Sequence, residues 1–119
     1  MMSPQEGTLS PITVRRGEIW AIQTGSDLPM RYCLVVSDNR INTGKIREIL
    51  TLSITARYFG YPHYVEIEPK LSPEERGPWY ARCDDPHAVP KKLLDHRVGE
   101  VAPAVMQEIN SWLKYFFAL

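Results

Sequence analysis

The chain has 119 residues, enough for one domain with one small hydrophobic core. Its 14 basic and 14 acidic side chains give a formal net charge of zero, so bulk charge does not indicate unspecific binding to nucleic acid. No apolar run approaches the roughly 18 residues of a transmembrane helix, and the first residues lack the pattern of a signal peptide. We therefore expect a cytoplasmic protein without membrane contact, in which Cys33 and Cys83 are reduced thiols.

The first half of the chain alternates apolar strands with polar loops. Residues 1–14 mix Pro, Ser, Gly and Thr and predict a flexible tail, so a single domain is expected over residues 15–119. Three strands are predicted, over residues 15–24, 31–38 and 46–56. The first should be buried on both faces at its centre. Residues 39–45 hold Asn, Gly and Thr and predict a turn or loop.

The second half continues the pattern and then changes period. Residues 57–62 predict an exposed loop, and residues 63–69 alternate as a fourth strand. A fifth strand is predicted over residues 78–83, an irregular stretch with a short helical turn over 85–96, and a last strand over 97–101. Apolar residues then recur at three- and four-residue spacing, which predicts a C-terminal amphipathic helix with one apolar face. That face consists of Val105, Met106, Ile109, Trp112, Leu113 and Phe116.

These elements predict a mainly β fold. Five to six short strands, and up to seven, with one packing helix are typical of a small, partly closed β-barrel. Pro103 suits the first turn of the helix, because it lacks an N–H that would be unpaired there anyway.

A polar stretch, Arg82-Cys83-Asp84-Asp85, stands at the end of the predicted fifth strand. A zinc site needs four ligands with paired spacing, which these residues do not have, so no metal is expected. Alternation along the strand turns Cys83 inward, which favours a buried thiol over a reactive one. Arg82 and Asp84 share the opposite face. Their spacing alone favours a surface ion pair, with an acid–base pair acting on a phosphate as the alternative.

Other polar residues could converge with this pair. Arg31 begins a core strand, and Ser53 and Thr55 alternate toward the end of the third strand, followed by Arg57. Aromatic residues beside arginines suit single-stranded nucleic acid, because bases stack while Arg meets phosphate. The aromatic residues in question are Tyr58, Phe59, Tyr61 and Tyr64. We also expect at least two of the four to belong to the core.

The order of "RRGEIWAI", "RYCLVVSD", "LTLSITA", "ARCDDPHAV" and the last helix resembles the PemK/Kid and MazF family of toxin endoribonucleases from type II toxin–antitoxin systems. The resemblance covers about residues 15–119. It implies a small SH3-like β-barrel that forms a homodimer, binds a cognate antitoxin and cleaves single-stranded RNA. It also implies cleavage without metal or other cofactor, through attack of the 2′-hydroxyl on the adjacent phosphate.

The resemblance also implies roles for residues. Asp84 matches the general base and Arg82 its partner; since a guanidinium has a pKa above about 12, we expect Arg82 to stabilise charge rather than donate a proton. Arg31 matches an arginine that holds the phosphate, and Thr55 a threonine that orients a phosphate oxygen or the 2′-hydroxyl. We expect three further residues to contact the RNA: Ser53, Arg57 and His87.

The chain departs from the family pattern in three places. Tyr32 follows Arg31 where the family has proline, the loop before Arg31 lacks the histidine of some members, and His87-Ala88-Val89 replaces Arg-Thr-Ile. Two alternatives therefore stay open: a CcdB-like poison of DNA gyrase, which has the same fold, and a catalytically inactive relative that binds an antitoxin or RNA.

Overall fold

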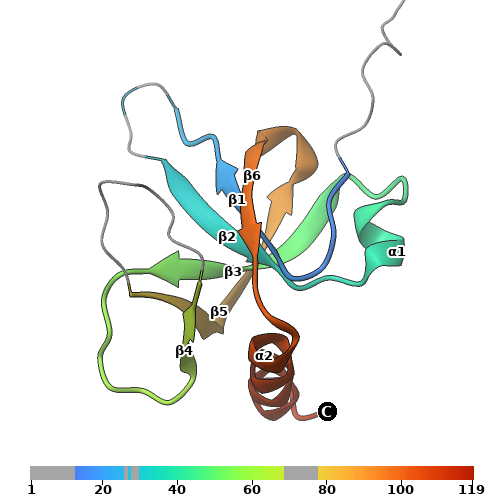
Figure 1. Ribbon diagram of the computed structural model, residues 1–119. Coiled ribbons are helices and arrows are strands. Elements are labelled where there is room, and N and C mark those ends of the chain that lie inside the picture. The colour runs from blue at the N-terminus through green and yellow to red at the C-terminus, as the bar shows by residue number, and fades with distance from the viewer. Residues whose placement is uncertain (1–12, 26, 28–29, 69–77) are drawn as a thin grey trace, which may run out of the picture.

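The part of the chain that the structure describes folds into six strands, one short helix and a longer C-terminal helix (Figure 1). The computed structural model describes residues 13–25, 27, 30–68 and 78–119, so residues 1–12 of the expected tail lie outside the described residues. In chain order the elements are β1 (Glu18–Ile22), β2 (Arg31–Val35), α1 (Asn39–Asn42), β3 (Glu48–Thr55), β4 (Tyr64–Ile67), β5 (Trp79–Pro90), a 3₁₀ turn η1 (Lys91–Leu93), β6 (Leu94–Glu100) and α2 (Pro103–Phe116). No helix in the described part of the chain is long and apolar enough to cross a membrane.

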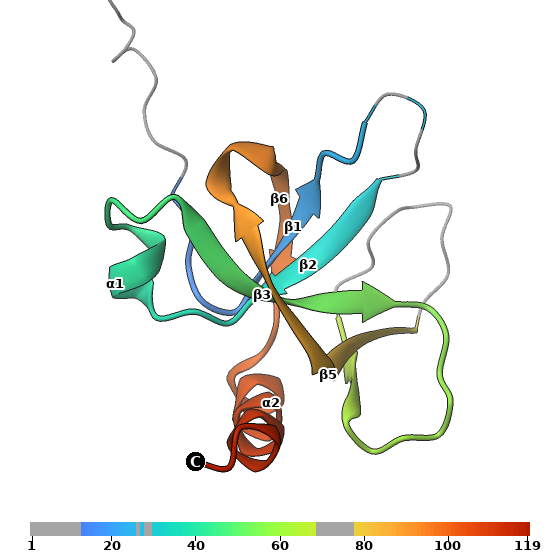
Figure 2. The ribbon, with the colours of Figure 1, turned by 180° about the vertical axis from the view of Figure 1, so that it is seen from behind.

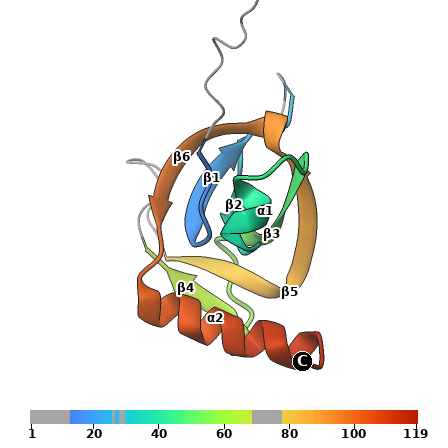
Figure 3. The same cartoon turned by 90° about the vertical axis from the view of Figure 1, so that its right-hand side faces the viewer.

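All six strands form one antiparallel sheet in the order β4-β5-β3-β2-β1-β6. The sheet curls strongly but stays open between β4 and β6, and α2 lies across one end of it, against β4 and β5 (Figure 3). The predicted mainly β fold, a partly closed barrel with a C-terminal helix, is confirmed.

The curled sheet buries side chains on both of its faces. Along β1, Ile19 enters one apolar cluster and Trp20 the other, as predicted for a strand buried on both sides. In α2, Ile109 is fully buried against the first cluster. The helix residues that pack around it are Val105, Met106, Trp112 and Leu113, which confirms most of the predicted apolar face. Phe116 is the exception, since 43% of it is exposed.

The start of β1 is held by the buried carboxylate of Glu18. Its Oε1 accepts hydrogen bonds from the backbone N–H of Arg15 at 2.8 Å and from the indole Nε1 of Trp20 at 3.0 Å. Its Oε2 accepts a hydrogen bond from Arg97 Nε at 2.9 Å, which ties β1 to β6. Gly17 has a φ of +92°, a backbone conformation that favours glycine. The Arg-Gly-Glu-Ile-Trp motif is thus a structural unit that anchors β1.

The turn or loop expected over residues 39–45 is instead partly helical, as α1. The side chain of Asp38 accepts a hydrogen bond from the backbone N–H of Arg40 and caps the helix. The side chain of Asn42 is buried and donates to the carbonyl of Ser37 at 2.9 Å. The expectation was wrong because these side chains satisfy the backbone and favour a helical turn.

The fifth strand also differs from the prediction, because β5 continues through Pro90, where an irregular stretch was expected. Ile54 pairs with Ala81 and Leu52 with Pro86, so residues 82–85 of β5 lie opposite Ser53 alone. This bulge bends β5 sharply (Figure 2). A strand can accommodate a proline at such an irregularity, where the ladder is already interrupted. The predicted helical turn is present as η1.

Candidate active site

The bulge of β5 places Arg82 and Asp84 side by side, as their alternation predicts. Arg82 Nε lies 3.3 Å from Asp84 Oδ1, and Arg82 Nη2 lies 3.1 Å from Asp84 Oδ2, so the two groups meet as a fork. Cys83 points the other way and is fully buried, as predicted. Burial, with smaller effects of Glu108 and Asp84, raises the pKa of the Cys83 thiol to about 12. Such a thiol is not activated as a nucleophile.

Arg82 and Asp84 each stabilise the charged form of the other. Partial desolvation raises the pKa of Asp84. The hydrogen bonds and the positive charge of Arg82, together with the charge of His63, lower it by more. The pKa of Asp84 therefore lies below its usual range. The hydrogen bond to Asp84 in turn raises the pKa of Arg82. At neutral pH the site therefore presents a carboxylate that can accept a proton beside a permanent cation that can bind an anion.

Asp85, to which the sequence assigned no role, forms a second ion pair with Arg82, at the guanidinium nitrogen Nη1. Its Oδ2 accepts a hydrogen bond from the hydroxyl of Ser53 at 2.6 Å and lies 3.9 Å from Arg82 Nη1. Ser53 was expected to contact RNA, but in this structure its hydroxyl binds Asp85. The contact exists because Ser53 is the single β3 residue opposite the bulge, a register that spacing along the chain does not reveal.

Sequence reasoning missed His63, whose imidazole lies beside Asp84. His63 Nε2 is 3.6 Å from Asp84 Oδ2, and the carbonyl of His63 accepts a hydrogen bond from the backbone N–H of Cys83 at 3.2 Å. The pairing of Tyr64 with Arg82 between β4 and β5 brings these residues together. Pairing the fourth and fifth predicted strands as antiparallel neighbours could have indicated this contact.

The structure places Arg31 and Thr55 on the same face as Arg82. Cys33 pairs with Ser53, where the ladder between β2 and β3 ends, and Arg31 and Thr55 each lie two residues further along their strands, on the same face of the sheet. Thr55 pairs on its other side with Tyr80, two residues before Arg82. Cross-strand neighbours share a face, so Thr55 lies on the same face as Tyr80 and Arg82, and Arg31 faces the same side from β2. Arg31 is exposed and has no carboxylate partner among the residues that the structure describes.

The structure does not place Arg57 and His87 beside the fork. Arg57 lies just beyond β3, where its backbone N–H donates to the hydroxyl of Thr55 at 3.1 Å. His87 follows the bulge on the second arm of β5, where it pairs with Thr51. Its Nδ1 lies 3.3 Å from the carbonyl of Asp85. Both side chains are exposed.

Exposed aromatic rings gather between β3 and β4. Tyr58, Phe59 and Tyr61 are each more than half exposed, whereas Tyr64 is buried. The expectation that at least two of the four belong to the core was wrong, because three of them lie on the connecting loop rather than in the sheet. Tyr58 stacks on Tyr80 with ring centroids 4.7 Å apart, and so extends the face of the fork.

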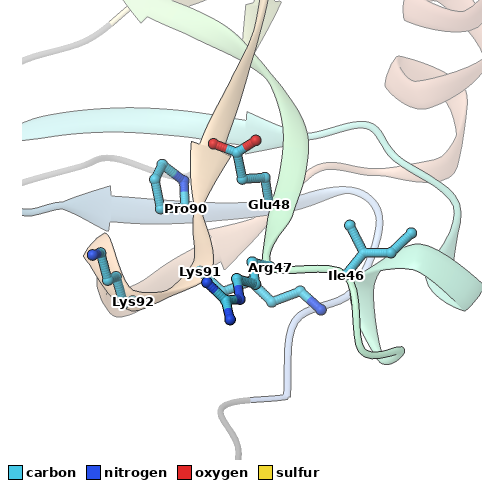
Figure 4. Close-up of a pocket in the computed structure, with 6 residues that line it drawn as sticks. All are labelled: Ile46, Arg47, Glu48, Pro90, Lys91 and Lys92. Atoms are coloured by element: carbon cyan, nitrogen blue, oxygen red, sulfur yellow. The ribbon is translucent and has the colours of Figure 1, made fainter.

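One pocket lies away from the fork. A pocket of about 630 Å³ lies at the other end of β3 and β5, between Ile46, Arg47, Glu48, Pro90, Lys91 and Lys92 (Figure 4). Glu48 pairs there with Pro90, seven residues before Thr55, so this pocket is separate from the fork. Among the described residues no group of three or more His, Cys, Asp or Glu side chains could hold a metal ion.

Comparisons with solved structures agree on the fold. The chain is 24% identical, with a TM-score of 0.73, to an endoribonuclease in complex with its cognate antitoxin from a mycobacterial species, over 89% of this chain and 96% of that one. It is 18% identical, with a TM-score of 0.74, to a chain of the MazE-MazF complex from Deinococcus radiodurans, over 91% and 98%. It is 16% identical, with a TM-score of 0.70, to the Mycobacterium tuberculosis toxin MazF-mt6, over 86% and 97%.

No curated protein sequence matches the chain. The sequence profile described as "PemK-like, MazF-like toxin of type II toxin-antitoxin system" matches residues 15–117, which include every strand, both helices and the bulge that carries Arg82 and Asp84. The resemblance seen in the motifs is therefore confirmed over nearly the whole domain, and the chain belongs to the family of PemK-like, MazF-like toxins of type II toxin–antitoxin systems.

Proposed function

We propose that the protein is a toxin that cleaves single-stranded RNA by metal-independent transfer of the phosphate to the 2′-hydroxyl. The observation that carries this proposal is the fork between Arg82 and Asp84, exposed on the bulge of β5. Such a fork holds a proton acceptor within reach of the anion that the arginine binds. The membership of the chain in a toxin family and the named endoribonucleases of the same fold support it.

In this mechanism Asp84 is the general base. It removes the proton of the 2′-hydroxyl, whose oxygen forms a bond to phosphorus while the bond from phosphorus to the 5′-oxygen breaks. The products are a 2′,3′-cyclic phosphate and, once the leaving oxygen takes up a proton, a 5′-hydroxyl. Arg82 and Arg31 stabilise the charge that builds up on the phosphate, and Thr55 orients one of its oxygens.

The RNA lies over the face of the sheet that carries Arg31, Thr55 and Tyr80. Exposed aromatic rings provide stacking surfaces for unpaired bases, and Arg57 adds a cation beside them. His87 contacts the RNA on the far side of the bulge, and Ser53 acts through Asp85. This arrangement suits a single strand, because paired bases would not be free to stack on the rings.

The proposal includes partners and a setting. A protein antitoxin restrains the toxin, as the mycobacterial complex and the MazE-MazF complex suggest by their names. The toxin acts as a homodimer in the cytoplasm, where sequence-specific cleavage of mRNA inhibits translation and growth.

The test is cleavage of a long RNA transcript by the purified protein in EDTA, followed by mapping of the ends. We expect 2′,3′-cyclic phosphate and 5′-hydroxyl ends at short recurring motifs. Asp84→Asn should lower the rate about 10²- to 10⁴-fold, the usual contribution of a general base. The matched control is Asp95→Asn on β6, where the carboxylate also contacts a histidine, His96, at 2.6 Å. It should cut at the parent's rate.

Three results would contradict this proposal. Equal rates for Asp84→Asn and the parent would remove Asp84 from the chemistry. Binding of RNA without cleavage would indicate an inactive relative that docks RNA or an antitoxin. Intact RNA with DNA breaks that depend on gyrase would indicate a gyrase poison.

A further inference from the structure

The imidazole of His63 lies beside Asp84 and is free to contact a substrate. At 3.6 Å, the contact between His63 Nε2 and Asp84 Oδ2 is longer than a hydrogen bond, so neither atom is committed to the other. The two side chains remain 18% and 28% exposed, so a substrate can approach both. The hydrogen bond from the backbone N–H of Cys83 to the carbonyl of His63 fixes the histidine next to the bulge.

Aromatic rings hold the imidazole of His63 in place on several sides. Tyr61 stacks on it with ring centroids 5.3 Å apart, and Tyr64 of β4 meets it edge-on at the same distance. From α2, Trp112 and Phe116 contact it edge-on at 5.9 and 5.1 Å. A ring packed in this way has few rotamers left, which suits a group that must be positioned for a reaction.

The proposed reaction needs a second proton transfer that the fork does not provide. An alkoxide at the 5′-oxygen is a poor leaving group, so cleavage is faster when an acid protonates this oxygen as the bond breaks. Arg82 is unsuited to this task, because its hydrogen bond to Asp84 raises its pKa further. Imidazole is the side chain that most often gives and takes protons near neutral pH.

We propose that His63 is the general acid of the site, working together with Asp84. This inference rests on the proposed function and deepens it. The proton of the 2′-hydroxyl goes to Asp84, the 2′-oxygen bonds to phosphorus, the bond from phosphorus to the 5′-oxygen breaks, and the 5′-oxygen takes the proton of the imidazolium. Asp84 is then a neutral acid beside a neutral imidazole. A transfer between these two neighbours, direct or through one water molecule, restores the starting state.

The charged and titratable groups around His63 come from three elements. Asp84 is the charge that faces it from β5, with Arg82 on the far side of that carboxylate, and the charge of His63 is among the causes that lower the pKa of Asp84. The titratable neighbours on the loop and on β4 are the phenols of Tyr61 and Tyr64. On α2, the groups in ring contact are apolar, and Glu108 lies one helical turn before Trp112. An imidazolium next to an ionised Asp84 is the pair that acid–base catalysis requires.

The test compares two substrates of identical sequence around a mapped cleavage site. One is ordinary RNA, and the other carries sulfur in place of the 5′-bridging oxygen at the scissile bond. A thiolate leaves without a proton because a thiol is far more acidic than an alcohol. His63→Phe keeps an aromatic ring against Trp112 and Phe116, and His63→Gln keeps a polar group toward Asp84. His96→Phe is the control for a histidine beside an aspartate elsewhere in the fold.

We expect both His63 variants to cut ordinary RNA about 10²- to 10⁴-fold more slowly than the parent. We also expect them to cut the sulfur substrate at nearly the parent's rate and to lose the alkaline limb of the pH profile of kcat/KM. Asp84→Asn should stay slow on both substrates, and His96→Phe should behave as the parent does. The assignment of His63 is overturned if its folded variants are equally slow on both substrates or keep the alkaline limb. An active Asp84→Asn would instead refute the proposed function.

Discussion

Replacement of Glu18 by alanine tests whether the Arg-Gly-Glu-Ile-Trp motif is structural. Glu18 is 6% exposed, and its loss leaves the indole N–H of Trp20 without its partner in buried surroundings. An unpaired buried donor costs about 1–3 kcal/mol, and the lost bond to the backbone of Arg15 adds about 1 kcal/mol. The ion pair with Arg97, whose side chain is 45% exposed, adds at most about 1 kcal/mol. We expect the free energy of unfolding to fall by about 3 kcal/mol.

Urea unfolding followed by far-UV circular dichroism measures this change. The double variant with Trp20→Phe separates the indole contribution, because phenylalanine has no N–H to leave unpaired. Glu18→Ala should therefore cost about 1–2 kcal/mol less in the Trp20→Phe background than in the parent. Glu48→Ala is the control, since Glu48 is exposed on β3, and it should stay within about 0.5 kcal/mol of the parent.

The rate of RNA cleavage completes this test. Well below the unfolding transition, Glu18→Ala should cut RNA at the parent's rate per folded molecule, because Glu18 lies away from the fork. The reasoning is refuted if Glu18→Ala unfolds at the parent's urea concentration, or if it is stable and folded but cuts RNA more slowly.

Three further predictions follow from burial and charge. Ile109→Ala should lower the free energy of unfolding by about 2–5 kcal/mol, because it opens a cavity under α2; a urea midpoint equal to the parent's would contradict this packing. Burial raises the pKa of the Cys33 and Cys83 thiols to about 12, so Ellman's reagent should react with them only after unfolding; rapid reaction of the native protein would show that the thiols are accessible. Arg82 holds the pKa of Asp84 below 3.8, so Asp84 stays ionised until the pH falls through that lowered value, and the acid limb of kcat/KM should lie below pH 3.8. Arg82→Gln leaves the effect of desolvation and should shift that limb to higher pH; an unmoved limb would assign it to another group.

Strand periodicity made much of the fold predictable, together with the part of the site formed by Arg82 and Asp84. Side chains alternate along any extended chain, so the opposite orientations of Cys83 and of the pair Arg82 and Asp84 follow from three neighbouring residues. The apolar spacing of residues 103–116 predicts α2 for the same reason, because helical periodicity is local. The helix α1 was missed because it depends on the side-chain hydrogen bonds of Asp38 and Asn42 rather than on a pattern.

The sequence by itself therefore determined the order and approximate place of the strands, the C-terminal helix, the inward thiol and the adjacency of Arg82 and Asp84. Only the tertiary structure decided that Ser53 and Asp85 meet, that Arg31 and Thr55 lie on the same face of the sheet, and that His63 lies beside Asp84. These contacts depend on which strands pair and in what register, and on a bulge that sets four residues against one. Register results from packing of the whole sheet, whereas alternation is a property of each strand alone.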